Sequence, residues 1–169
     1  MESTTDDFAK ACIEKFGQIG DGTQNHFLTN SYHHHVTDKV DAFTKLLDEE
    51  QFSDKTTSGS ISYVEVPNMS NNIDAMLEII NFIGENCLYS EINSEISSCS
   101  TCGFHGYDFK KTLAEDGTIR WQCPHCGEID PEKVKTSYRI CGYISNYVPN
   151  QGRSEDILNR VKHLNIDNE

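Results

Sequence analysis

Four cysteines at paired spacing are the residues whose types and positions most directly specify a chemistry. Cys99 and Cys102 form one Cys-x-x-Cys pair, and Cys123 and Cys126 form a second pair after residues 103–122. A two-residue gap lets both sulfurs of one turn reach the same ion at about 2.3 Å, and two such turns complete a tetrahedron. The spacing therefore predicts a four-cysteine zinc ribbon.

The residues around the cysteines support a closed, structural metal site. Gly103 and Gly127 each follow the second cysteine of a pair, where the turn needs a permissive backbone. Four thiolate ligands leave no open position on the ion, so we expect structural Zn²⁺ and not a Lewis acid. An iron–sulfur cluster is the alternative metal group. His105 or His125 could replace a cysteine as ligand, but we interpret both as surface histidines.

Gly142 is the second candidate, in the stretch Tyr138-Arg139-Ile140-Cys141-Gly142-Tyr143-Ile144. Taken alone, a glycine in such a stretch indicates a turn or a close approach of the backbone to another group. The order of the motifs adds information. Two cysteine pairs come first, then the Arg-x-Cys-Gly-Tyr stretch, and then the ending Arg160-Val-Lys-His163-Leu.

Composition limits the classes of partner and the compartment. The 169 residues carry a net charge of −13, which repels phosphate backbones and opposes nucleic-acid binding. We see no apolar run long enough to span a bilayer and no signal peptide in the acidic residues 1–7, so we expect a cytoplasmic protein without membrane contact. In a reducing cytosol, cysteines serve as ligands or thiols more often than as disulfides. Cys12 and Cys87 lie on apolar helical faces, and we interpret both as core residues.

The elements that must position these residues follow from apolar periodicity. The pattern predicts helices over 8–16, from Asp38 onward, over 73–83 with Asn71 or Asn72 as cap, and from Ser154 to about Leu164. Residues 27–36 and 61–66 are expected to be extended, residues 93–100 a linker, and residues 131–152 mostly loop. Alternation of helix and strand indicates α/β layering in the first half. Two strands make a poor sheet, so we expect a larger structure to supply the missing strands.

The ordered set of motifs resembles the C-terminal end of anaerobic (class III) ribonucleotide reductases. The resemblance extends upstream to Thr29-Asn-Ser-Tyr-His33, to Gly59–Val66 (GSISYVEV), to the Asn72-x-x-Ala75 helix and to Tyr89-x-x-Ile92-Asn93. It therefore covers nearly the whole chain. It implies an α+β or α/β fragment: the C-terminal piece of a ten-stranded α/β barrel, followed by a four-cysteine zinc ribbon and a glycyl-radical loop.

The resemblance also implies a chemistry for Gly142. A radical-SAM activase would abstract one α-hydrogen from this glycine, and the radical would pass to a thiyl cysteine in the active site. That thiyl would take the 3′-hydrogen of a ribonucleoside triphosphate, with formate as reductant. Cys141 could relay the radical, and the alternative is a packed cysteine. The consecutive His33, His34 and His35 cannot all bind one metal from a strand, and we assign them no role.

The resemblance divides the chain into three parts: residues 1–94 from the barrel region, 95–130 as the zinc module, and 131–169 as the radical loop and terminal helix. Family members carry the barrel and the thiyl cysteine upstream, so we expect activity only with a larger partner chain. The assembled enzyme could be a homodimer. Three origins would explain the short chain: a split gene of which it is the downstream product, a truncated remnant, or a stand-alone radical domain. The alternative functions are a stand-alone zinc-ribbon interaction module and a non-catalytic remnant of the reductase.

Overall fold

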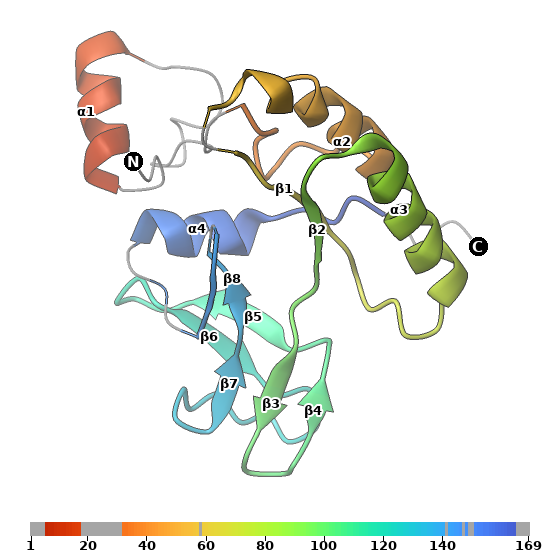
Figure 1. Ribbon diagram of the computed structural model, residues 1–169. Coiled ribbons are helices and arrows are strands. Elements are labelled where there is room, and N and C mark those ends of the chain that lie inside the picture. Colours follow the sequence, from red (N-terminus) through yellow and green to blue (C-terminus); the bar gives the residue numbers. More distant parts are fainter. Residues whose placement is uncertain are drawn as a thin grey trace. The chain divides into compact units, whose positions relative to one another are not determined.

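The computed structural model describes residues 6–17, 32–57, 59–140, 142–146, 148 and 151–164. These residues form two compact units (Figure 1). The cysteine unit takes its described residues from 1–30 and 95–159, and the βαβ unit takes them from 31–94 and 160–169. The two units are defined by compactness and not by function. The expected division into barrel-derived residues 1–94, zinc module 95–130 and radical loop with terminal helix 131–169 therefore stays a prediction.

The βαβ unit is built around two parallel strands. Its elements in chain order are α2 (Ala42–Glu50), the 3-10 turn η2 (Ser53–Lys55), β1 (Ser62–Glu65), α3 (Ile73–Asn86) and β2 (Ser90–Asn93). β1 pairs with β2 in the register Ser62↔Ser90 to Glu65↔Asn93, and α3 is the crossover that a parallel pair requires (Figure 1). Helix α2 contacts both β1 and α3. The core of the unit consists of Ala42, Leu46, Val64, Val66, Met69 and Ile79.

Side-chain caps determine where the two helices begin. Asp41 accepts hydrogen bonds from the N–H groups of Phe43 and Thr44, so α2 begins after Asp41 and not at Asp38. Asn72 accepts from the N–H of Ala75 and caps α3, as the sequence indicated. The expected extended stretch 27–36 gives no strand in its described part, 32–36, and residues 27–31 lie outside the described residues.

The chain after α4 returns to the βαβ unit as an extended segment. Val161 N–H donates to Val36 O at 2.9 Å, and His163 N–H donates to Glu65 O at 2.9 Å. The C=O of His163 in turn accepts from Ala42 N–H at 3.0 Å. Residues 160–164 therefore fix the end of β1 to the start of α2.

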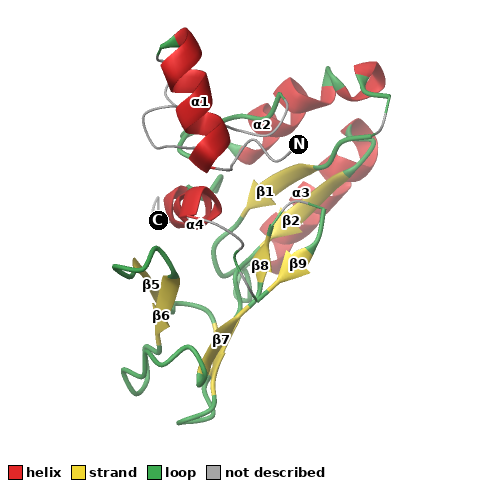
Figure 2. Ribbon diagram, turned by 90° about the vertical axis from the view of Figure 1, so that its left-hand side faces the viewer, coloured by secondary structure: helices red, strands yellow, loops and turns green. Residues whose placement is uncertain are grey.

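The cysteine unit consists of short strands around a small core. It contains α1 (Asp6–Phe16), β3 (Ser97–Cys99), β4 (His105–Gly106), β5 (Lys110–Leu113), β6 (Ile119–Gln122), β7 (Val134–Thr136), β8 (Tyr138–Arg139), β9 (Ile144–Ser145) and α4 (Gln151–Asn159). The strands pair as a β4-β3-β7 sheet, whose strands are labelled in Figure 1, and as two hairpins, β5-β6 and β8-β9, whose strands are labelled in Figure 2. The buried core is formed by Cys99, Phe109, Ile119, Trp121, Cys123, Val134, Tyr138, Ile140 and Ile157.

Two expectations for the C-terminal third need correction. Residues 131–152, expected to be mostly loop, also hold three short strands, because Val134, Thr136 and Tyr138 alternate with exposed residues and are buried. The last helix runs over Gln151–Asn159 and does not extend from Ser154 to Leu164. Its continuation is extended because Val161 and His163 find backbone partners on Val36 and Glu65. Tertiary contacts here override the helical pattern of the sequence.

The fold is thus a mixed α/β arrangement that carries a cluster of four cysteines. Among the described helices, none has the length and apolar character needed to cross a membrane.

The buried imidazole of His163 gives a prediction about pH. Burial and the Lys45 ammonium lower the pKa of His163 to about 4, against about 6.5 in an unfolded chain. Its neutral Nδ1 accepts the N–H of Glu65 at 2.9 Å. Between pH 6.5 and 4, the imidazole therefore binds a proton in the unfolded chain and stays neutral in the folded chain. The contribution of His163 to stability is full above about pH 6.5 and is lost as pH falls toward 4.

We expect this loss to reach about 1–2 kcal/mol after allowance for solvent screening. The measurement is urea unfolding of the full chain between pH 7.5 and 4.5, in roughly half-unit steps. His163→Asn supplies an amide oxygen that can accept the same N–H without titrating, so it should flatten the profile in this window. Glu49 has a pKa of about 2 in the folded chain and an ordinary value of 4.5, so it adds to the loss only near the lower end of the window and does so equally in both proteins. Equal slopes for both proteins would show that His163 does not cause the dependence.

Candidate metal centre and glycine hairpin

The first cysteine pair lies in a knuckle turn that follows β3. Cys99 N–H donates to Phe104 O at 2.8 Å, and Gly103 N–H donates to Cys99 O at 2.9 Å. The φ of Gly103 is +73°, in the left-handed region that favours glycine. These bonds bring the Sγ atoms of Cys99 and Cys102 to the same side of the turn.

The second cysteine pair repeats this geometry after β6. Cys123 N–H donates to Glu128 O at 2.8 Å, and Gly127 N–H donates to Cys123 O at 2.9 Å. The φ of Gly127 is +76°, again left-handed. The two turns therefore have the same backbone geometry. The left-handed φ after each cysteine pair explains why a glycine stands there.

The four sulfurs converge on one point. They all lie within 4.8 Å of one another, and no other group of three or more His, Cys, Asp or Glu side chains in the described part of the chain meets the same test. The Sγ–Sγ distance is 3.6 Å from Cys99 to Cys126 and 3.7 Å from Cys102 to Cys123. A tetrahedral ion with about 2.3 Å to each sulfur needs edges of about 3.8 Å. The four cysteines could therefore hold a metal ion such as zinc.

The electrostatics of the cluster favour a cation. Burial alone raises the pKa of the Cys99 thiol, but the N–H groups of Cys102 and Thr101 outweigh it and lower this pKa to about 7. At Cys126 the N–H of Glu128 lowers the pKa, but desolvation and the neighbouring sulfurs raise it to about 12. One thiolate thus forms readily, and its negative charge opposes the ionisation of the next thiol. A bound divalent ion would remove this repulsion and allow all four to ionise.

The two histidines of the module do not join the four sulfurs. His105 is exposed in β4, and the exposed ring of His125 stacks on Phe104 with centroids 6.0 Å apart and an interplanar angle of 13°. The described geometry therefore contains a set of four sulfur ligands and no nitrogen ligand.

Gly142 lies between β8 and β9, in the turn of the hairpin that these two strands form. The strands pair Tyr138 with Ser145 and Arg139 with Ile144, and Ile140 N–H donates to Tyr143 O at 2.9 Å across the turn. Gly142 is exposed, as are the side chains of Tyr143 (49%) and Ile144 (66%). The hairpin thus presents the glycine and two apolar side chains to its surroundings.

The structure does not require a glycine at position 142. A Cβ built there would meet no heavy atom of the described residues within 4 Å, its two chain neighbours aside, and its φ is outside the left-handed region. The two usual structural reasons for a glycine, a positive φ and a close approach, are therefore both absent at Gly142. Gly103 and Gly127 differ, because their positive φ explains them.

The base of the hairpin is fixed in the core of the cysteine unit. Trp121 Nε1 donates to the hydroxyl oxygen of Tyr138 at 2.6 Å, and the two rings lie 6.0 Å apart. Burial raises the pKa of Tyr138 to about 12, although the Trp121 N–H acts in the opposite direction. Tyr138 and Ile140 share this core with Cys99 and Cys123. The cysteine cluster and the glycine hairpin are therefore built on one core.

Sequence reasoning did not single out Trp121 or Tyr138. The available signal was the alternation of buried and exposed positions along Ile119–Gln122 and Val134–Tyr138, which is the period of a strand. Such a period shows that a residue enters a core. It does not show which two buried side chains will meet.

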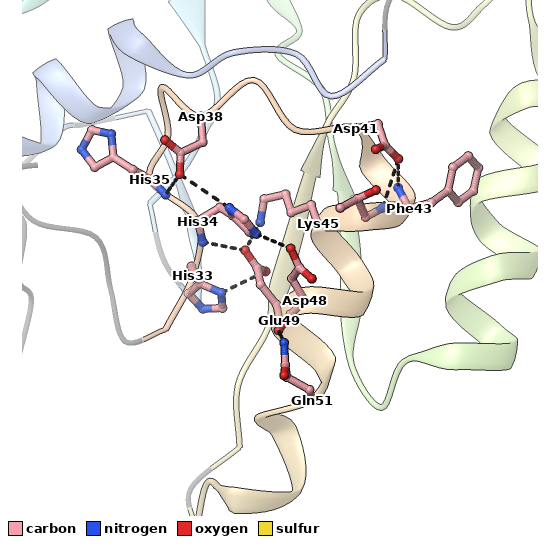
Figure 3. Close-up of polar contacts among 11 residues, drawn as sticks. His33, His34, His35, Asp38, Asp41, Phe43, Lys45, Asp48, Glu49 and Gln51 are labelled. Atoms are coloured by element: carbon pink, nitrogen blue, oxygen red, sulfur yellow. Dashed lines mark hydrogen bonds and ion pairs between the residues drawn. The ribbon is translucent and has the colours of Figure 1, made fainter. Parts of the chain in front are cut away.

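The consecutive histidines belong to the βαβ unit, where Figure 3 shows them beside α2. His33 Nδ1 lies 3.0 Å from Glu49 Oε2, and the N–H of His34 donates to Glu49 Oε1 at 3.0 Å. Lys45 also pairs with Glu49. Burial by itself raises the pKa of Glu49, but the His33 hydrogen bond and the Lys45 charge outweigh it and lower the pKa to about 2. Glu49 therefore stays ionised.

Each of the other two histidines has a separate set of partners. His34 lies between Asp48, at 3.0 Å from Nε2, and Asp38, at 3.5 Å from Nδ1. His35 N–H donates to Asp38 at 2.9 Å, and its Nδ1 lies 2.7 Å from the hydroxyl oxygen of Thr37. The three rings do not converge, and the contacts hold residues 33–38 against α2 (Figure 3).

The remaining cysteines lie apart from the cluster. Cys12 is half-buried in α1, and Cys87 is half-buried and packs against the βαβ core, where burial raises the pKa of its thiol. Cys141 lies outside the described residues.

Comparison with known proteins identifies the family. The family model described as anaerobic ribonucleoside-triphosphate reductase matches residues 1–163. The anaerobic ribonucleoside-triphosphate reductase of Enterobacteria phage T4 is 35% identical over 161 residues, which cover 92% of this chain and 25% of the phage protein. The proteins of the same name from Haemophilus influenzae and Escherichia coli are 34% and 31% identical over 166 residues, which cover 96% of this chain and 23% and 22% of theirs.

The chain therefore spans about a quarter of the length of the curated relatives that it matches. The family match covers nearly the whole chain, including both cysteine pairs and the glycine hairpin. The chain belongs to the anaerobic ribonucleoside-triphosphate reductase family.

Proposed function

We propose that this chain is the C-terminal, glycyl-radical part of an anaerobic ribonucleoside-triphosphate reductase, active with a larger chain that carries the barrel and the thiyl cysteine. The observation that supports this most directly is Gly142. It is a glycine that neither backbone conformation nor space requires, at the exposed tip of a hairpin, in a chain of this family. Because the geometry gives no reason for a glycine here, the family match supports a chemical one.

The chemistry of an α-carbon radical explains the choice of residue. When an activase takes one hydrogen atom from Gly142, the remaining electron delocalises over the flanking amide nitrogen and carbonyl, and the α-carbon flattens. A side chain would crowd that planar form and the approach of the activase. The exposed turn leaves the α-carbon accessible, and the buried Tyr138 and Ile140 hold the hairpin that carries it.

The four cysteines of the cluster together would hold one structural Zn²⁺. Cys99, Cys102, Cys123 and Cys126 provide sulfurs at distances that fit a tetrahedral ion. With four sulfurs the ion has no open position, so its contribution is to fold the core beneath the hairpin. The task of this chain would be to position a reactive species, and the assembled enzyme would shield it.

The reaction itself needs the larger chain. The radical at Gly142 would pass to a thiyl cysteine there, and that thiyl would take the 3′-hydrogen of a ribonucleoside triphosphate, with formate as reductant. The other partner is the radical-SAM activase, and the compartment is the cytoplasm. The net charge of −13 argues against nucleic acid as a partner. We assign no step to Cys141.

The open edge of β2 supports a larger partner chain. Ser62 N–H donates to Tyr89 O and Val66 N–H donates to Asn93 O, so the odd-numbered peptide groups of β2 face β1. The N–H and C=O groups of Ser90 and Ile92 then face away from β1. Within the described residues β2 pairs with β1 alone, whereas each strand of a closed barrel has two neighbours. The exposed Leu77 and Ile80 of α3 offer further apolar surface.

Removal of the metal should unfold the cysteine unit and leave the βαβ unit folded. Cys99 and Cys123 are core residues, and structural Zn²⁺ in small modules contributes about 10–16 kcal/mol of binding free energy. We expect about one zinc per chain by elemental analysis, and a red shift of Trp121 fluorescence after chelation. Trp121 is the single tryptophan. Cys102→Ser should lower the zinc content, and Cys87→Ser is the matched control. A chain without zinc whose Trp121 emission stays unchanged would contradict the assignment, as would the visible absorption of an iron–sulfur cluster.

Gly142→Ala should separate the fold from the chemistry. A methyl group at this position meets nothing within 4 Å, so the free energy of unfolding should change by less than about 1 kcal/mol. The radical, however, should be lost. We would incubate wild type and variant anaerobically with the activase, S-adenosylmethionine and a reductant, and record electron paramagnetic resonance spectra. Gly84→Ala, at an exposed glycine of α3 that also meets nothing within 4 Å, is the control. A radical of wild-type yield in Gly142→Ala would place the radical elsewhere.

Ser90→Pro should block the outer edge of β2. Proline removes the N–H that faces away from β1 and keeps the bonds between β1 and β2. We expect the variant to fold, by circular dichroism, and to bind the larger chain about tenfold or more weakly. Ser90→Ala, which keeps the N–H, is the control. Equal affinity of both variants for the larger chain would show that this edge is not the contact.

A further inference from the structure

The carboxylate of Glu65, at the end of β1, is buried and has three polar side chains around it. Glu65 is 5% exposed. Asn93 Nδ2 donates to its Oε1 at 2.8 Å, and the Arg160 guanidinium lies 3.5 Å from the same oxygen. The Lys162 ammonium lies 3.8 Å from Oε2. A buried carboxylate is expensive unless it is paired, so these contacts explain why Glu65 is tolerated there.

The three partners have a particular place in the chain. Asn93 is the last residue of β2, directly before the chain leaves the βαβ unit, and Arg160 is the first residue after it returns. The segment between them, 95–159, contains both cysteine pairs and Gly142. A single carboxylate therefore contacts both ends of the segment that carries the candidate metal centre and the candidate radical residue.

The backbone of Glu65 reinforces the second of these ends. Its C=O accepts from His163 N–H at 2.9 Å, and its N–H donates to His163 Nδ1 at 2.9 Å. At the first end, Val66 N–H donates to Asn93 O at 2.9 Å. The main chain of Glu65 thus binds His163, which follows segment 95–159, and its side chain binds Asn93, which precedes that segment.

We propose that Glu65 is a positioning residue for Gly142. It fixes both ends of segment 95–159, and so restricts the conformations from which the hairpin can reach a partner. The proposal rests on the proposed function in one respect, that Gly142 is the radical residue. A purely structural role for Glu65 would lower the stability of the whole βαβ unit and would not act on the two ends in particular.

The test compares Glu65→Gln with wild type in the zinc-loaded full chain. Glutamine keeps the shape and an acceptor for Asn93, but it removes the charge that pairs with Arg160 and Lys162. Hydrogen exchange at the N–H groups of Val161, His163 and Val66 should accelerate about tenfold or more. Exchange at Ile79, in the core of the same unit, should change by less than about threefold. Glu78→Gln, on the exposed surface of α3, is the matched control and should change none of these.

A double-mutant cycle then shows whether the ion pair carries the effect. Arg160→Gln alone should accelerate exchange at Val161 and His163, and Glu65→Gln/Arg160→Gln should add little to either single variant. Additive effects would overturn the proposed coupling. Equal acceleration at Ile79 and at both ends, or no acceleration at either end, would overturn the proposal as a whole.

The functional arm is the radical yield after anaerobic activation. Glu65→Gln should lower the yield at Gly142 several-fold relative to Glu78→Gln, at unchanged zinc content. A wild-type yield in Glu65→Gln would overturn the positioning role even if the ends exchange faster. If wild type itself forms no radical, the proposed function fails, and the exchange data still decide whether Glu65 fixes the two ends. The two failures are therefore distinguishable.

Discussion

The convergence of four cysteine sulfurs within 4.8 Å is the constraint on which the cysteine unit depends. Two knuckle turns produce it, each closed by the same pair of backbone hydrogen bonds and each followed by a glycine with positive φ. Cys99 and Cys123 belong to the core that also contains Tyr138 and Ile140, at the base of the Gly142 hairpin. So small a core, made of short strands, has few other sources of stability. An ion at the cysteines would therefore stabilise the hairpin as well as the turns.

Gly142 in the hairpin differs from the glycines of the two knuckle turns. Gly103 and Gly127 are required by their backbone conformation, whereas Gly142 is required neither by φ nor by space. The backbone conformation thus explains Gly103 and Gly127, and for Gly142 we propose a chemical role instead. In the βαβ unit, no other strand of the described residues pairs with the outer edge of β2, and helix α3 exposes apolar residues. Both features suit a chain that spans about a quarter of its relatives' length.

Some of this arrangement could be predicted from the sequence, and some could not. Ligand spacing is a local property, so the cysteine pairs and their glycines predicted the knuckles, and Asn72 predicted the start of α3. The extended form of residues 160–164 could not be predicted, because it depends on Val36 and Glu65, which are distant in sequence. The strands β7 and β8 were missed although Val134, Thr136 and Tyr138 alternate, because runs this short compete with the turn-forming Pro and Gly residues around them. The pairing of Trp121 with Tyr138 depends on how two hairpins pack, which no local pattern encodes.

The central claim, that Gly142 is a radical residue, has a direct test. The chain would be incubated anaerobically with its activase, S-adenosylmethionine and a reductant, with and without the larger reductase chain, and examined by electron paramagnetic resonance. Air would then be admitted and the intact mass measured. The account predicts a doublet radical signal and oxygen-dependent cleavage of the backbone at Gly142. A zinc-bound, folded chain that gives neither signal nor cleavage, with or without the larger chain, would contradict the account and favour a zinc-ribbon interaction module or a non-catalytic remnant.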